Sequence, residues 1–229
     1  MNDFADRHWD GRVERTENRP LANGSLTPQD ALITTAVLML LAFVLVLLTN
    51  ALTIKLSFIA LFLALLYPYT KRITHWPQLF LGLAFAWAVP MAFAAQSGSV
   101  PVSAWIVFCA AVIWAIAYDT LYAMVDRNDD IKVGIKSTAI FFGQHDLLMV
   151  GIAQTTMLFL MMLAGHLNSR GWIFLVSLCV AGFLIAKQLH DCRHRDRDEC
   201  FKAFKNNHQV GLIIFIGLAS DYFFSQAGL

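Results

Sequence analysis

The sequence predicts an all-α protein, a polytopic bundle of transmembrane helices with seven spans, on the strength of three observations. Hydrophobic residues make up 58% of the 229 positions and charged residues only 14%, an apolar excess too large for one soluble core. The apolar residues gather in long uncharged segments that lack the alternation of a membrane β-barrel. Basic residues gather in alternate loops, as expected for a chain that crosses a membrane repeatedly.

The first two spans occupy residues 31–69. No charged residue occurs from Ala31 to Ile54. This segment can cross a hydrocarbon core of about 30 Å, which takes a helix of roughly 20 residues. A second span follows from Leu56 to about Tyr69. Lys55 stands at its edge, where a long side chain can reach the membrane surface.

The next uncharged stretch, from Ile73 to Tyr118, is too long for one helix. The segment from Gln96 to Pro101 contains Gly and Pro, and it divides the stretch into two spans. Three more apolar runs complete the seven: about Leu147 to Ala164, Gly171 to Ala186 and Val210 to Phe224.

The distribution of charge gives the spans an orientation. When the loops are assigned alternately to two sides of a membrane, all but two of the 17 Lys and Arg residues fall on the side of the N-terminal segment. The exceptions are Lys55 and Arg170. This bias predicts that the basic loops are cytoplasmic. The net charge of +1 argues against nucleic acid as a partner. A transporter or a structural subunit is disfavoured, because only Asp119 and Asp221 place a charge within spans, both near span ends.

Two groups of polar residues on the basic side have helical spacing. Asn2, Asp6 and Asp10 lie at i, i+4 and i+8, and they would line one face if residues 2–10 are helical. The second group lies at i, i+3, i+7 and i+11 on a helix that leaves the membrane: Asp119, Tyr122, Asp126 and Asp130. Each group stands beside basic residues.

Two carboxylate stripes on one side of a bundle predict a site for a hard divalent cation. Mg²⁺ takes oxygen ligands and is usually held by one or two carboxylates together with substrate phosphates. A pair of Mg²⁺ ions on a diphosphate would offset the repulsion between the carboxylates. The alternative is a pair of solvated acidic loops, which is the ordinary meaning of a single acidic cluster.

Two further clusters on the basic side carry weaker signals. Lys71 and Arg72 end a span, and taken alone they would only orient it. A group of His and Cys residues lies between His190 and His208. It lacks the paired spacing of a zinc site, so a solvated basic loop is the favoured interpretation.

Three segments resemble the UbiA membrane prenyltransferases, and most closely their 4-hydroxybenzoate polyprenyltransferase branch. YDTLYAMVDRNDDIKVGIKSTAIFFG, residues 118–143, is similar to the second Asp-rich motif of the family. NDFADRHWDGRVERTENRPLANG, residues 2–24, is similar to the first motif of that branch, and YPYTKRITHWPQLFLG, residues 67–82, to the loop between. The likeness covers nearly the whole chain.

The resemblance implies a reaction and its substrates. A Mg²⁺-bound polyprenyl diphosphate would ionise to an allylic cation. The ring carbon ortho to the hydroxyl of 4-hydroxybenzoate would then attack it, in an early step of ubiquinone biosynthesis. Two alternatives remain: another aromatic acceptor, or a family member without catalytic activity.

The resemblance also implies roles for individual residues. The metal ligands would be Asn2, Asp6, Asp10, Asp126 and Asp130. The catalytic residues would be Asp6, Asp119, Tyr122, Asp126 and Asp130. The diphosphate or the benzoate carboxylate would be bound by Arg15, Lys71, Arg72, Lys132 and Lys136.

The chain departs from the family in one respect. Family members have nine membrane helices, and their first motif lies at the cytoplasmic end of the second helix, whereas here that motif begins at Asn2. We therefore expect a single integral-membrane domain over residues 1–229 that lacks the first two helices. No Arg-rich presequence is present, which favours a bacterial inner membrane over a mitochondrial one.

Overall fold

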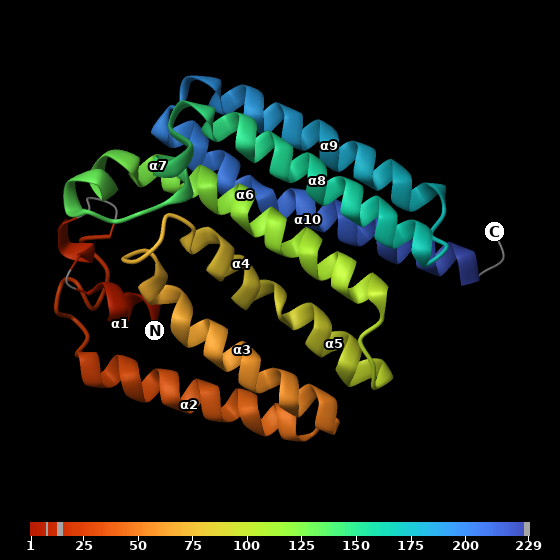
Figure 1. Ribbon diagram of the computed structural model, residues 1–229, viewed down its shortest axis with the longest axis horizontal. Coiled ribbons are helices and arrows are strands. Elements are labelled where there is room, and N and C mark those ends of the chain that lie inside the picture. The colour runs from red at the N-terminus through yellow and green to blue at the C-terminus, as the bar shows by residue number, and fades with distance from the viewer. Residues whose placement is uncertain (8, 13–15, 227–229) are drawn as a thin grey trace.

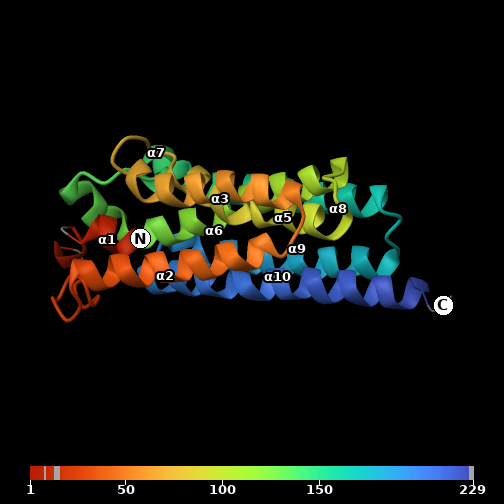
Figure 2. The same cartoon turned by 90° about the horizontal axis from the view of Figure 1, so that it is seen from below.

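The fold is an elongated all-helical bundle (Figure 1). The structure, a computed structural model, describes residues 1–7, 9–12 and 16–226. Within this part of the chain no strand occurs, which confirms the predicted fold class. Seven helical segments there are long and apolar enough to cross a membrane, as the sequence predicted. They run along the long axis of the molecule in both views (Figures 1 and 2).

The first two spans are the helices α2 (Pro28–Leu47) and α3 (Ala51–Thr70). A capping box between Thr27 and Asp30 starts α2. The prediction that the first span reaches Ile54 is wrong, because the side chain of Asn50 accepts a hydrogen bond from the Thr53 N–H and starts a new helix. Lys55 therefore lies inside α3.

The third span consists of two short helices, α4 (Pro77–Ala86) and α5 (Ala88–Ser97). The break between them at Trp87 has a local cause. Pro90 has no N–H to donate to the carbonyl of Ala86, so the α-helical ladder is interrupted there. Gly98 adopts a φ of +71° and ends α5, consistent with the predicted division of this stretch.

Helix α6 (Val102–Val133) is the longest element and carries the second Asp-rich motif. Its 32 residues run well past the apolar segment that ends near Tyr118, which confirms that one helix continues beyond the apolar span. It ends at Gly134, whose φ of +75° is the left-handed conformation common after helices.

The C-terminal half completes the bundle with α7 (Thr138–Phe142), α8 (Asp146–Leu167), α9 (Trp172–Asp191) and α10 (Arg197–Gln226). Helix α10 begins 13 residues before the apolar run that predicts it, because its first turns are polar and lie beyond that run. At its other end, Asp221 accepts hydrogen bonds from the backbone N–H groups of Gly171 and Phe174, at 2.9 Å and 3.4 Å. It thereby caps the start of α9 from a neighbouring helix.

Four helices pack together into one group: α6, α8, α9 and α10. Helix α4 packs against α6 of this group and against α3, and α3 in turn packs against α2 (Figure 1). Gly82 lets α4 approach α6 closely, since a Cβ there would lie 2.9 Å from the Val112 carbonyl oxygen. Helix α2 buries none of its residues against the protein. A long helix of mean hydropathy 2.5 with no buried side chain is the surface that a lipid bilayer covers.

Candidate active site

One end of the bundle gathers the predicted polar residues. There the short helix α1 (Asn2–Asp6), the 3-10 helix η1 (Asp10–Arg12), α7 and the last turns of α6 lie together (Figure 1). We call this the polar end. It contains an open cleft. The predicted residues that line it are Asn2, Asp6, Asp10, Lys71, Asp119, Tyr122, Asp126, Asp130 and Lys136.

The first Asp-rich motif forms one wall of this cleft. Residues 2–10 do not make the continuous helix that the spacing suggested, because α1 ends at Asp6 and η1 begins at Asp10. Asn2, Asp6 and Asp10 nevertheless all line the cleft. The side chain of Asp6 is 1% exposed, and its Oδ2 pairs with the Lys71 ammonium. Its Oδ1 is buried without a hydrogen-bond partner in the part of the chain that the structure describes.

Asp10 is buried beside Arg19. The Arg19 Nη1 lies 3.2 Å from Asp10 Oδ2 and 3.1 Å from Asp3 Oδ1, so one guanidinium joins two carboxylates of the motif. Burial raises the pKa of the Asp10 carboxyl above its usual value, and the charge of Arg19 opposes that effect. Arg19 lines the cleft although the sequence analysis assigned it no role. Its place in the RTENRP segment of the first motif, residues 15–20, is the signal that points to it.

The second Asp-rich motif forms the facing wall. Asp119, Tyr122, Asp126 and Asp130 all line the cleft, so the i, i+3, i+7, i+11 spacing does place them on one face of α6. Asp126 is buried. Because α6 is continuous from the membrane segment to Val133, a single rigid element holds all four side chains.

Two predicted lysines lie at the junction of the walls. Lys71 follows α3, and its backbone carbonyl accepts a hydrogen bond from the Lys136 N–H at 3.0 Å. The Lys136 ammonium donates to the carbonyl oxygen of Ile73, also at 3.0 Å. The loop after α6 is thus held against the loop after α3, with both lysines on the cleft.

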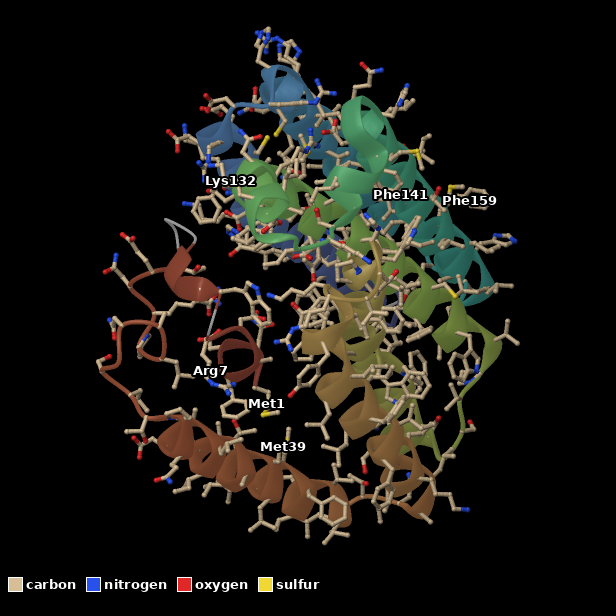
Figure 3. The ribbon with its side chains drawn as sticks, turned by 60° about the vertical axis from the view of Figure 1, so that its left-hand side comes forward. Met1, Arg7, Met39, Lys132, Phe141 and Phe159 are labelled. Atoms are coloured by element: carbon tan, nitrogen blue, oxygen red, sulfur yellow. The ribbon has the colours of Figure 1, made fainter. Side chains whose placement is uncertain are left out.

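The other predicted cations lie elsewhere. Arg72 is not part of the lining: its guanidinium lies 4.3 Å from the ring centroid of Trp9 and donates to the carbonyl of Ala5, so it holds the N-terminal segment. The Lys132 side chain is 73% exposed and pairs with Asp129. Figure 3 shows Lys132 apart from Met1 and Arg7, which flank the short helix α1 of the first motif. Arg15 lies outside the described residues.

Gln78 and Thr138, which the sequence analysis did not single out, fix the inner edge of the cleft. The Thr138 N–H donates to Gln78 Oε1 at 3.1 Å, and the Thr138 hydroxyl lies 2.6 Å from that of Thr120. All three residues are buried. These contacts connect the segment after α6 to both α4 and α6, so the second motif and its following loop form one unit.

A row of aromatic rings leads from the cleft into the membrane segment. The Tyr122 ring lies 4.6 Å from that of Phe204, Phe204 lies 6.0 Å from Tyr118, and Tyr118 lies 5.7 Å from Trp114, measured between ring centroids. Such rings present π faces that attract positive charge.

The donors of the cleft fit a cation that arrives with its own anionic ligand. No cluster of three or more His, Cys, Asp or Glu at metal-binding distance exists among the described residues, including the His and Cys group at 190–208. The oxygen-rich walls and the unpartnered Oδ1 of Asp6 nevertheless suit a hard cation. Mg²⁺ usually relies on one or two carboxylates plus phosphate oxygens rather than on a complete protein cage.

Comparison with known proteins identifies the family. The model of the UbiA prenyltransferase family matches residues 1–216. The chain belongs to this family. It is 55% identical over 222 residues to a protein named 4-hydroxybenzoate octaprenyltransferase from Enterobacter sp. (strain 638), a match that covers 97% of this chain and 77% of that protein. A protein of the same name from Citrobacter koseri matches with the same identity and coverage.

Solved structures agree with a UbiA fold. The apo structure of a UbiA homologue from Aeropyrum pernix K1 superposes with a TM-score of 0.84 at 24% identity, over 96% of this chain and 82% of that one. A structure reported for digeranylgeranylglyceryl phosphate synthase superposes with a TM-score of 0.70 at 19% identity, over 95% of this chain and 77% of that one. The UbiA family and the seven apolar helices make this an integral multi-pass membrane protein.

Proposed function

We propose that this chain transfers a polyprenyl group from a polyprenyl diphosphate to 4-hydroxybenzoate, at the ring carbon ortho to the hydroxyl, in an early step of ubiquinone biosynthesis. Its 55% identity to two proteins named 4-hydroxybenzoate octaprenyltransferase supports this assignment. The structural observation that carries it is the cleft at the polar end, where carboxylates from two motifs face each other and two lysines stand between. That donor set suits a metal-bound diphosphate.

The metal is the first part of the proposal. UbiA prenyltransferases are generally metal-dependent, and we propose Mg²⁺ for this chain. Asn2, Asp6 and Asp10 of one wall would hold one Mg²⁺ ion, and Asp126 and Asp130 of the other wall would hold a second. When bound, the metal would neutralise charge on the departing diphosphate and so favour ionisation.

The cations of the cleft would bind the anionic ends of the two substrates. Lys71 and Lys136 both line it, so we assign them contacts with the diphosphate or the benzoate carboxylate. Fixed positive charge also stabilises the diphosphate as it leaves. Arg72 would act through the N-terminal segment that it holds. Roles of Arg15 and Lys132 in substrate binding stay predictions.

The inner part of the cleft would handle the carbon chemistry. Tyr122 and the aromatic row behind it would offer π faces to the allylic cation. Among the three α6 carboxylates that line the cleft, Asp119 lies farthest from the C-terminal end of the helix. It is therefore our candidate base for the proton that the ring loses after the new carbon–carbon bond forms.

The membrane setting follows from the substrates. A polyprenyl chain dissolves in lipid, whereas its diphosphate and 4-hydroxybenzoate are polar, so a cleft at one end of a transmembrane bundle meets both. We propose a bacterial inner membrane with the polar end in the cytoplasm. The concentration of Lys and Arg in the loops of that end supports this orientation.

The test is transfer of labelled 4-hydroxybenzoate to a polyprenyl diphosphate by membranes that contain this chain and no other such activity. We expect a Mg²⁺-dependent prenylated product and stoichiometric diphosphate release. Asp126→Asn should abolish the product, whereas the exposed Asp198→Asn, the same change on α10, should not. Full activity of the Asp126→Asn variant would refute the assigned mechanism.

A further inference from the structure

The last turns of α6 present charged residues on two sides. Asp126 and Asp130 line the cleft, whereas Arg127 and Asp129 form ion pairs with other elements. Arg127 pairs with Asp146, the first residue of α8, and Asp129 lies 3.4 Å from the Arg197 guanidinium at the start of α10. The back of the second Asp-rich motif is therefore tied to two neighbouring helices.

Asp146 is the centre of this arrangement. Its side chain is 0% exposed, yet two arginines reach it from different elements. The Arg127 guanidinium pairs with Oδ2, while Arg195 Nε and Nη2 lie 3.0 Å and 2.9 Å from Oδ1. The Leu147 N–H adds a hydrogen bond of 2.6 Å to Oδ1. Such charge-assisted bonds are the strong ones, and a paired arginine fixes direction as well as distance.

Arg195 reaches Asp146 from a loop that is itself firmly seated. It adopts a φ of +56°, which a residue with a side chain keeps only where its surroundings require it. Its Nη2 also donates to the carbonyl oxygen of Gln144 at 2.7 Å. The loop is flanked by Cys192, which follows α9, and by Cys200 in the first turn of α10, and both are fully buried in one apolar cluster with Leu121 of α6.

We propose that Arg127, Asp146 and Arg195 form a clamp that positions the second Asp-rich motif for the metal-bound diphosphate. The clamp holds the rotation of α6 about its axis, and this rotation decides where Asp126 and Asp130 point. A site of this kind needs its groups held within about 0.5 Å of the productive geometry. Arg127, Asp146 and Arg195 are positioning residues, since they act through α6. The inference rests on the proposed function for its kinetic consequences only.

The most informative variant is Arg195→Asn. Asn tolerates the left-handed conformation of this position, so the change removes the contacts of Arg195 with Asp146 and with the Gln144 carbonyl at little backbone cost. Arg193→Asn is the matched control, because Arg193 lies in the same loop, is exposed, and donates to the carbonyl of His190 instead. Arg195→Lys, which keeps the charge but not the fork of donors, should give an intermediate result.

The first measurement needs no substrate. Amide hydrogen exchange of residues 126–133 reports how firmly the end of α6 is held. In Arg195→Asn we expect these amides to exchange about tenfold faster or more, a change that the loss of hydrogen bonds to a charged group can produce. Exchange in α2 and in the Arg193→Asn control should match the unaltered protein. Unchanged exchange at 126–133 in Arg195→Asn would overturn the clamp.

The second measurement separates positioning from stability. We expect Arg195→Asn to raise both the Mg²⁺ concentration for half-maximal rate and the KM for polyprenyl diphosphate, by about 10- to 100-fold, as changes behind a metal site do. The KM for 4-hydroxybenzoate should stay within a factor of about two, since the clamp lies behind the metal site. A purely structural role would lower the amount of active protein and leave these constants unchanged, which would also overturn the proposal.

The two measurements keep this inference distinct from the proposed function. Faster exchange at 126–133 with no prenyl transfer even by the unaltered chain would refute the proposed function and leave the clamp standing. Prenyl transfer by the unaltered chain, with normal exchange and normal metal dependence in Arg195→Asn, would refute the clamp and leave the proposed function standing. Asp146→Asn provides the stronger perturbation, but it leaves two arginines without their carboxylate and can prevent folding.

Discussion

Lys71 donates a hydrogen bond to Asp6, a carboxylate 65 positions earlier in the chain, and this ion pair joins the first Asp-rich motif to the end of α3. Asp6 is almost fully buried, while Lys71 is partly open to the cleft. The Lys71 ammonium thus balances the negative charge of the Asp6 carboxylate. The same ammonium lines the space that a diphosphate would occupy, so Lys71 serves both the structure of the site and its charge.

The change Lys71→Met should impair both stability and catalysis. It leaves the buried Asp6 carboxylate unpaired, which should cost about 1–3 kcal/mol of unfolding free energy, and it removes a cation from the diphosphate site. We expect the KM for polyprenyl diphosphate to rise at least about tenfold. Thermal unfolding in detergent and steady-state rates measure the two effects.

A double variant separates these effects. Asp6→Asn combined with Lys71→Met removes both charges, so much of the lost stability should return, because no unpaired charge stays buried. Activity should fall further, since a proposed metal ligand is also lost. Recovery of activity together with stability would mean that Lys71 acts only as the partner of Asp6.

Arg72 should matter through the N-terminal segment that it holds. Its guanidinium stacks on Trp9 and donates to the carbonyl of Ala5. Arg72→Lys keeps the charge but loses the planar stacking, which contributes about 0.5–1 kcal/mol or more. We expect faster proteolysis near residues 1–10 and a lower rate. Trp9→Ala should have a similar effect. The double variant should be no worse than either single variant, because both changes remove the same stacking contact between Arg72 and Trp9. Additive losses would contradict this pairing.

Tight packing between α4 and α6 should make Gly82 intolerant of substitution. A Cβ at this position would lie 2.9 Å from the Val112 carbonyl oxygen and 3.2 Å from the Ala115 Cβ. Gly82→Ala should therefore lower the unfolding free energy by about 1–3 kcal/mol through overpacking. Gly182→Ala is the matched control, because its nearest neighbour, the Leu158 Cδ1, would lie at an ordinary 3.5 Å. Equal melting temperatures for the two variants would argue against close packing at Gly82.

The sequence alone predicts the elements whose cause is local. Seven apolar runs yield seven spans, and the spacing of the α6 stripe places Asp119 and Asp130 on one cleft because the helix between them is continuous. The break at Asn50 escapes prediction from hydropathy, since it depends on a side-chain cap inside an uncharged run. The pairing of Asp146 with Arg127 also escapes it, because the two residues meet only when α6 and α8 pack.

The opposite end of the bundle should contribute stability without affecting substrate constants. There Asp221 of α10 accepts hydrogen bonds from the Gly171 and Phe174 N–H groups and so replaces a local cap of α9. Asp221→Ala should cost about 1 kcal/mol, as the loss of a helix cap does. Its KM values and Mg²⁺ dependence should match those of the unaltered chain, because the cap lies at the end of α10 away from the cleft (Figure 1). Gly171→Ala should act similarly, since a Cβ there would lie 2.9 Å from Asp221 Oδ1. A shift of metal dependence in either variant, measured beside its melting temperature, would show that this end communicates with the cleft.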